Sequence, residues 1–402
     1  MNKTQEMPVS TAQQGYALNT QLARFSCIRC GTQLPLADYF EGCPACLTEG
    51  QPAAIRSEFH QFPMKLGALD VQGMARYAAW MPYSSWVSLG EGGTPCTPFN
   101  RLADALGVAA IHLKNEGMNP SGSHKDRVSC LTVTRALDIG ATKIVAASSG
   151  NGGASLALYA AAADLKCCIV STPALSPIHR RAITLTGAEL VIADDSLERW
   201  RLVTEMVKQQ GWFSATNYLN PPVGSNHFGV DGLRTIAFEL VEDLGPDNID
   251  AVLVPTSRGD LLWGLYEGFR QLKAMERIKA LPRLFAVEPF PRIDRVLNGA
   301  AQTGTFPGST ALFSIGGSTV TYQAAEAIRQ TGGNAVVVDD TAVVRDQSRL
   351  ARHGCYAELS SAATLTALEI LLQKGEIARN DAVVLIATSN GYKDLPDAAS
   401  VA

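Results

Sequence analysis

The sequence predicts an α/β protein built from doubly wound parallel sheets, and three observations support this fold class. The chain has 402 residues, 46% of them hydrophobic and 18% charged, so it can bury large cores in two or three domains. Short apolar runs rich in β-branched residues occur at 143–147, 167–171, 189–193, 251–255, 284–287, 335–338 and 382–387. Segments of helical length separate most of these runs, which is typical of parallel strands covered by helices on both faces. We expect two such domains behind a small cysteine-bearing module.

The first 50 residues predict a polar arm and then a metal-bound module. Residues 1–24 have little hydrophobic periodicity, so we expect a surface arm. Residues 25–50 hold four cysteines with the spacing C-x2-C-x12-C-x2-C, at Cys27, Cys30, Cys43 and Cys46. A segment this short cannot bury a core, so the pattern predicts a structural zinc ribbon with all four ligand positions filled. Two disulfides or four free thiols are the alternatives.

Residues 119–127 join a strand-like run at 110–114 to a helical pattern that begins after Lys125. The Asn-Pro and Ser-Gly pairs in this segment end the strand-like run. A lysine in the first turn of a helix is unfavourable for helix stability, because the macrodipole places positive charge there. The same field, together with desolvation, lowers the pKa of an amine, which suits a lysine that forms a Schiff base. For this position taken alone, the alternative is a solvated lysine beside a capping Ser123.

Two other strand-like runs lead into turns that could bind a small molecule. The run 143–147 continues into SSGNGGAS at 148–155, and a glycine-rich turn before a helix exposes backbone amides. The run 251–255 continues into TSRGD at 256–260, where hydroxyls, an arginine and a helix N-terminus predict a phosphate cradle. Asp260 would repel an anion, so we expect its carboxylate to turn aside or to pair with Arg258. Purely structural turns are the alternative.

The last strand-like run, 382–387, delivers TSNGYKD at 388–394. In an open parallel sheet, ligands bind beyond the carboxyl ends of the strands. We therefore expect Thr388 to reach the same crevice as Lys125 and Asn151. A capping role for the Thr388 hydroxyl is the alternative.

In their order along the chain, these motifs resemble those of the fold type II pyridoxal-phosphate (PLP) enzymes, and of threonine synthases in particular, including forms with a four-cysteine ribbon in front. The segments that carry the resemblance are GGTP at 92–95, NPSGSHKDR at 119–127, SSGNGGAS at 148–155, GLRTIA at 232–237, VEP at 287–289, ELSSA at 358–362 and the final TSNGYKD. The resemblance covers residues 25 to about 395. It implies a large cofactor-binding domain formed by 51–130 and 225–402, and a small α/β domain formed by 131–224.

The resemblance also assigns roles to residues. It implies that Lys125 is the catalytic residue that holds PLP covalently and that Asn151 hydrogen-bonds the ring hydroxyl. The residues implied for the cofactor phosphate are Thr256, Ser257, Arg258 and Gly259, and those for the substrate α-carboxylate are Ser148, Ser149 and Ser155. The Thr388 hydroxyl would meet the pyridine nitrogen. A neutral hydroxyl there does not keep the ring protonated, which favours elimination or replacement at the β or γ carbon over transamination.

The implied reaction is the conversion of O-phosphohomoserine to threonine and phosphate. Cationic side chains should then converge on the substrate phosphate, and the candidates are Lys114, Arg127, Arg180, Arg181 and Arg234. For Arg127, an ion pair with Asp126 is the competing expectation.

The alternative within the enzyme class is β-replacement or β-elimination on a serine-, cysteine- or O-phosphoserine-like substrate in a specialised pathway. Three departures from threonine synthases motivate it: His124 where an aromatic residue is usual, TSRGD where a Gly-Asn-Gly-Gly-like run is usual, and Ser389-Asn390 where Gly and His are usual. A second alternative is a zinc-ribbon binding module on an inactive enzyme body. Only the four-cysteine segment supports it, and the flanks of that segment carry few basic residues.

The charge and hydropathy of the chain predict which partners it binds and where it is located. The formal net charge of -4 and the pI near 5.9 give no general attraction to nucleic acid or anionic membranes. No apolar run reaches the length of a membrane span, and the first 25 residues lack the layout of a signal peptide. We therefore expect a cytoplasmic enzyme, a homodimer, that acts on a small amino acid and binds neither nucleic acid nor membrane.

Overall fold

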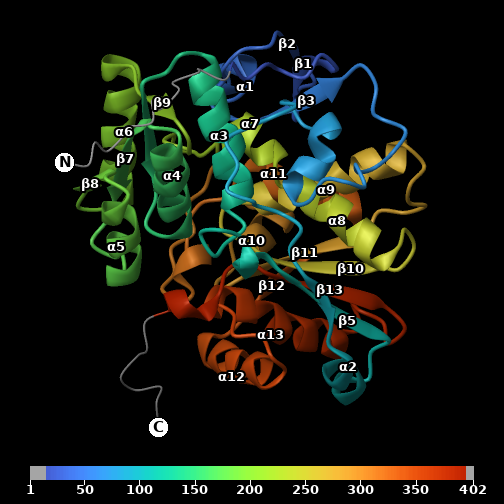
Figure 1. Ribbon diagram of the computed structural model, residues 1–402. Helices are drawn as coiled ribbons and strands as arrows, with labels where there is room; N and C mark the ends of the chain where they lie inside the picture. Colours follow the sequence, from blue (N-terminus) through green and yellow to red (C-terminus); the bar gives the residue numbers. More distant parts are fainter. Residues whose placement is uncertain (1–14, 395–402) are drawn as a thin grey trace, which may run out of the picture.

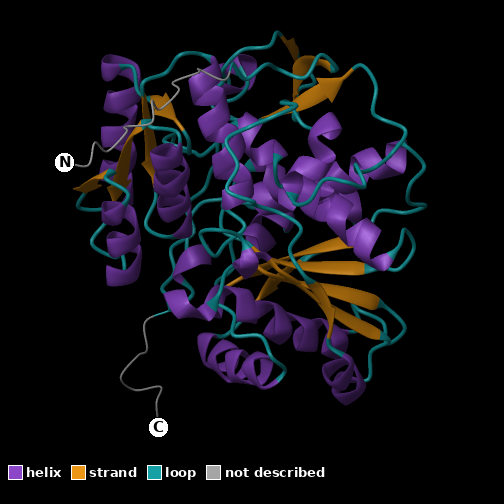
Figure 2. Cartoon of the chain, in the orientation of Figure 1, coloured by secondary structure: helices purple, strands orange, loops and turns teal. Residues whose placement is uncertain are grey.

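Two sheets, one of six strands that is mostly parallel and one of four strands that is fully parallel, form the body of the protein in the computed structural model. The structure describes residues 15–394 (Figures 1 and 2). The six-stranded sheet has the order β12-β11-β10-β13-β5-β4. Its strands are β12 (Ala335–Val337), β11 (Arg283–Glu288), β10 (Ala251–Pro255), β13 (Ala382–Ala387), β5 (Ala110–Asn115) and β4 (Cys96–Pro98). All pairings are parallel except that of the edge strand β4 with β5.

Helices cover the six-stranded sheet on both faces because its strands are apolar on both sides. One face, which includes Val252, Val254 and Ile386, packs against helices α8 (Arg234–Leu244), α9 (Asp260–Ala274) and α11 (Tyr322–Thr331). The other face, which includes Leu253 and Leu385, packs against α2 (Asn100–Leu106), α12 (Asp340–Arg352) and α13 (Leu359–Lys374). The short helix α10 (Ile293–Leu297) follows β11. The near-continuous apolar runs in the sequence thus correspond to strands that are buried on both sides.

The four-stranded sheet has the order β8-β7-β6-β9, and all of its pairings are parallel. Its strands are β8 (Glu189–Ile192), β7 (Lys166–Ser171), β6 (Lys143–Ala147) and β9 (Phe213–Ser214). One face packs against α3 (Asp126–Asp138), α4 (Asn151–Ala162) and α5 (Pro177–Leu185), and the other packs against α6 (Ser196–Gln210). The predicted α/β fold class is therefore confirmed.

The cysteine module includes strand residues on both sides of the predicted 25–50 segment. It forms a three-stranded antiparallel sheet in the order β2-β1-β3, with strands β1 (Leu22–Cys27), β2 (Gln33–Leu34) and β3 (Ile55–Phe59), and it carries the short helix α1 (Pro44–Thr48). In Figure 1 it lies at the top, in blue, beside α3 and the short helix α7 (His227–Asp231). Phe25 of β1 packs edge-on against the His227 and Phe228 rings of α7, at centroid distances of 4.7 and 5.3 Å. The module thereby shares the main hydrophobic core.

Some of the remaining connections contain 3-10 helices, at Met74–Trp80, Glu116–Met118, Phe313–Ile315 and Gly391–Lys393. Within residues 15–394, no helix has the length and apolar character needed to cross a membrane. Most of the predicted polar arm, residues 1–14, lies outside the described residues. Its described end contacts the body, since the Asn19 amide donates to the Pro82 carbonyl at 2.7 Å.

Candidate active site

Lys125 occupies the N-cap position of α3, at the end of the predicted turn. The preceding residues are joined to the end of β13: the His124 amide donates to the Thr388 carbonyl at 3.0 Å, and the Ser389 hydroxyl donates to the Gly122 carbonyl at 3.0 Å. Burial lowers the pKa of Lys125, and the charge of Arg258 adds to this effect while Asp260 and Glu358 oppose it. The structure therefore combines a helix start and a lowered amine pKa at this half-buried lysine.

Asn151 is the first residue of α4 and faces the segment that follows β13. Its Nδ2 donates to Glu358 Oε2 at 2.8 Å, and its Oδ1 accepts from Lys393 Nζ at 2.8 Å. The His179 Nε2 atom lies 3.2 Å from the same Oδ1. Roles for Glu358, Lys393 and His179 were not predicted from the sequence, although ELSSA and TSNGYKD contain the first two. The segments that carry Lys125, Asn151 and Thr388 therefore meet, as expected for ends of parallel strands.

The turn between β10 and α9, predicted to cradle a phosphate, requires a glycine and leads directly into a helix. Gly259 has φ +100°, and a Cβ at this position would lie 2.4 Å from the Ala324 Cβ, so a glycine is required. The Ser257 hydroxyl packs closely against Gly317. A Cβ added to Gly317 would lie only 3.2 Å from the Ser257 Oγ. The turn stands at the N-terminus of a 15-residue helix, whose dipole favours a negatively charged ligand.

Asp260, the residue that should repel an anion in this turn, is turned aside. Its carboxylate accepts hydrogen bonds from the Ser225 hydroxyl at 2.6 Å and from Gln323 Nε2 at 3.0 Å. Arg258 does not pair with it. Instead, the Arg258 guanidinium lies over the Trp200 ring of α6, 5.6 Å from the ring centroid. Of the two arrangements expected for Asp260, the structure has the first.

The three serines of the turn 148–155 lie in different surroundings. The Ser148 hydroxyl accepts from the Gly153 amide at 2.8 Å, and the Ser149 hydroxyl accepts from Arg199 Nη1 at 2.7 Å. The Ser155 hydroxyl is buried and donates to Asp126 at 2.6 Å, so it ties α4 to the start of α3. Ser148 and Ser149 therefore lie in the turn itself, whereas Ser155 lies inside the helix behind it.

Thr388 follows β13 and is buried. Its hydroxyl lies 2.9 Å from the Ser361 hydroxyl of α13, while its carbonyl accepts from the His124 amide. The partner of the Thr388 side chain is thus another neutral hydroxyl.

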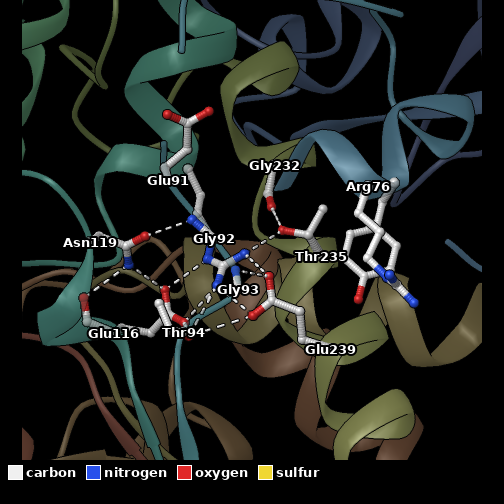
Figure 3. A network of polar contacts seen from close by, with 12 residues as sticks. Arg76, Glu91, Gly92, Gly93, Thr94, Glu116, Asn119, Gly232, Thr235 and Glu239 are labelled. Atoms are coloured by element: carbon white, nitrogen blue, oxygen red, sulfur yellow. Dashed lines mark hydrogen bonds and ion pairs between the residues drawn. The ribbon is translucent and has the colours of Figure 1, made fainter. Parts of the chain in front are cut away.

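Lys114 and Arg127, expected to hold a substrate phosphate, are instead buried in a network of ion pairs. Arg127 contacts Glu116 at 2.8 Å and Glu239 at 2.6 Å, and Lys114 contacts Glu239 at 2.7 Å. Figure 3 shows how Glu116 and Glu239 converge with the Thr94 hydroxyl, which donates to Glu116 at 2.6 Å. Burial opposes ionisation of Glu239, but Arg127 and Lys114 lower its pKa to about 2. Both cations are thus neutralised within the protein.

The expected Asp126–Arg127 ion pair is wrong, since the Asp126 carboxylate accepts from the Ser121 and Ser155 hydroxyls. Among the other candidate cations, Arg234 is buried beside Asp231 at 3.3 Å, and Arg180 and Arg181 are exposed on α5. The candidate cations therefore do not converge on one point.

The four cysteines of the N-terminal module form a separate cluster. Their Sγ atoms all lie within 4.8 Å of one another, and the Cys27–Cys46 and Cys30–Cys43 pairs are 3.6 and 3.7 Å apart. A tetrahedron with zinc–sulfur bonds of about 2.3 Å has edges of about 3.8 Å, so the spacing fits four zinc ligands. None of the four is in a disulfide. The amides of Arg29 and Cys30 donate to the Cys27 sulfur at 3.3 and 3.4 Å, as in a zinc knuckle.

Comparisons with known proteins agree with this geometry. Residues 87–389 match the family model described as "Pyridoxal-phosphate dependent enzyme". The chain is 30% identical over 392 residues to the threonine synthase of Methanocaldococcus jannaschii, with 93% of each chain covered. It is 29% identical over 384 residues to the threonine synthase of Methanosarcina acetivorans, covering 92% of this chain and 91% of the relative.

Solved structures share the fold at lower identity. Threonine deaminase isoform 2 from Solanum lycopersicum superposes with a TM-score of 0.64 at 19% identity, over 77% of this chain and 85% of that one. O-ureido-L-serine synthase superposes with a TM-score of 0.61 at 22% identity, over 75% and 90%.

Proposed function

Because this chain belongs to the pyridoxal-phosphate-dependent enzyme family, we propose that it is a threonine synthase, converting O-phosphohomoserine to threonine and phosphate. The observation that carries the proposal is that three segments lie close to Lys125. The Ser155 hydroxyl of the turn 148–155 donates to Asp126, and the Thr388 carbonyl after β13 accepts from the His124 amide. The charges of Arg258 and Asp260, in the turn 256–260, act on the Lys125 amine. Similarity to threonine synthases over 93% of the chain supports the choice of reaction.

The residues present fit the cofactor. When bound, PLP supplies an aldehyde that takes up the substrate amine and a ring that withdraws electrons from the bonds at the α carbon. Lys125, with its lowered pKa, would hold the cofactor and then take up and return protons. Thr256, Ser257, Arg258 and Gly259 would bind the cofactor phosphate through hydroxyls, backbone amides and the α9 N-terminus.

Two side chains would set the electronic state of the ring. The Asn151 amide would donate to the ring hydroxyl, and its contacts with Glu358 and Lys393 fix its orientation. The Thr388 hydroxyl would face the pyridine nitrogen as a neutral partner, which favours elimination and replacement. The backbone amides of the turn, with Ser148 and Ser149, would bind the substrate α-carboxylate.

A structural zinc ion held by Cys27, Cys30, Cys43 and Cys46 is a further part of the proposal. The sulfur spacing and the two amide donors to the Cys27 sulfur support it. With four protein ligands the ion has no open position, so it would stabilise the fold and take no part in the reaction.

The test of the proposed reaction is phosphate release from O-phospho-L-homoserine by the purified holoenzyme, with threonine identified as the product. We expect turnover of roughly 1 per second or faster, the ordinary range for enzymes, and none in Lys125→Ala. Failure to release phosphate, combined with consumption of L-serine or O-phospho-L-serine, would instead establish β-elimination or β-replacement as the reaction.

A further inference from the structure

Arg199 differs from the other buried arginines in having no carboxylate partner in the part of the chain that the structure describes. Four buried arginines each pair with an acid: Arg127 with Glu116 and Glu239, Arg135 with Asp38, Arg234 with Asp231 and Arg292 with Glu288. Arg199 is only 8% exposed, and its Nε is buried without a partner among residues 15–394. A buried charge is normally paired, because its desolvation is costly. The positive charge of this guanidinium is therefore not balanced by a neighbouring carboxylate.

The unpaired guanidinium lies beside the turn proposed for the substrate α-carboxylate. Arg199 is in the first turn of α6, and its Nη1 donates to the Ser149 hydroxyl at 2.7 Å. The Thr172 hydroxyl, which follows β7, lies 3.2 Å from the same oxygen. Ser149 and Thr172 both follow carboxyl ends of parallel strands, the edge at which such sheets bind ligands.

A second cation faces the same place from the other sheet. Arg258 projects from the turn before α9 onto the ring of Trp200, the neighbour of Arg199 in the chain. Its closest acidic neighbour in sequence, Asp260, is bound to Ser225 and Gln323. Burial, followed by the charge of Arg258, lowers the pKa of Arg199 to about 10. Two like charges thus lie close enough to repel each other. Asp260 attracts Arg258 only at longer range, and no carboxylate of residues 15–394 forms an ion pair with either guanidinium.

We propose that Arg199 is a specificity-determining residue that binds a second negative group on the substrate, while Arg258 adds to the positive potential. This inference rests on the proposed function, and it assigns the substrate to the α-amino acids whose side chain ends in a phosphate or a carboxylate. Arg199 thereby takes the place of Lys114 and Arg127, whose charges the protein neutralises. A guanidinium suits either group, because its donors match two oxygens at once.

The test compares charged and neutral amino acids as ligands of the holoenzyme. The absorbance of bound PLP is followed during titration with O-phospho-L-homoserine, O-phospho-L-serine and L-aspartate, and then with L-homoserine and L-serine. We expect Arg199→Gln to weaken binding of the preferred charged ligand by about 10- to 100-fold, which is the contribution of one charge-assisted hydrogen bond. The affinity for the neutral ligands should change by less than about twofold. Arg201→Gln is the matched control, because Arg201 is exposed on the same helix and pairs with Glu198.

Three other outcomes would contradict either the role of Arg199 or the proposed function. Equal weakening of charged and neutral ligands would show that Arg199 only positions Ser149, and would overturn the inference. Neutral ligands that bind wild-type enzyme as tightly as charged ones would overturn it too, while leaving the proposed function standing. If no amino acid changes the spectrum, the proposed function itself fails. Arg199→Lys keeps the charge but loses the paired N–H donors of the guanidinium. Its affinity for the charged ligand should lie between those of wild type and Arg199→Gln. If Arg199→Gln does not fold, Arg199→Lys is the variant to be compared with wild type.

Discussion

Replacement of Arg127 by methionine should destabilise the protein strongly, because this side chain neutralises two buried carboxylates. Its guanidinium donates to Glu116 from Nε and Nη2, both at 2.8 Å, and to Glu239 from Nη1 and Nη2, at 2.6 and 2.8 Å. Lys114 and Arg127 together balance Glu116 and Glu239, so the substitution leaves one buried negative charge uncompensated. Breaking a buried pair in this way costs about 3–5 kcal/mol.

The assay is urea denaturation followed by circular dichroism at constant pH, with the free energy of unfolding compared between variants. Arg127→Met combined with Glu116→Gln restores the charge balance and should recover at least about 1 kcal/mol of the loss. Arg201→Met, at an exposed ion pair, should leave the midpoint nearly unchanged. A free energy of unfolding for Arg127→Met within about 1 kcal/mol of wild type would contradict this role of the arginine, as would a double variant no more stable than the single one.

Three further predictions concern the metal, pH and the phosphate turn. Wild-type protein should contain one zinc ion per chain by elemental analysis, and Cys43→Ser should lose both the metal and thermal stability. Burial lowers the pKa of His227 to about 3, so lowering the pH from 7 to 5 protonates this histidine in the unfolded chain but not in the folded one. That difference should remove about 2 kcal/mol of stability, and His227→Phe should abolish this loss in urea denaturation at the two pH values. Gly259→Ala should weaken PLP binding at least about tenfold in a cofactor titration, because its Cβ would meet Ala324, whereas Gly375→Ala, with open space around it, should not.

Features coded within a few neighbouring residues were predictable. The strands 143–147, 251–255 and 382–387 match β6, β10 and β13 residue for residue, because buried parallel strands leave continuous apolar runs. The turn before Lys125 was predictable from its one proline and one glycine, Pro120 and Gly122. The cysteine spacing indicated the cluster that the structure contains.

Features that depend on distant residues were not predictable. The Arg127 partner Glu239 is 112 residues away in sequence, so local sequence indicates the adjacent Asp126 instead. β3, at Ile55–Phe59, pairs with β1 across the cysteine turns, and no local pattern indicates that pairing. Arg199 carried no signal in the sequence because its importance lies in the missing carboxylate. The domain boundaries, the homodimer and the cytoplasmic location stay predictions.

The central claim is that Lys125 holds the cofactor, and peptide mapping after borohydride reduction tests it most directly. Reduction fixes PLP to the lysine that holds it. A second, half-buried amine lies close by, since Lys393 Nζ is 2.8 Å from Asn151 Oδ1. We predict a phosphopyridoxyl group on the peptide that contains Lys125, in protein that absorbs at the violet edge of the visible range. Labelling at Lys393, or colourless protein that cannot be reconstituted with PLP, would contradict this assignment.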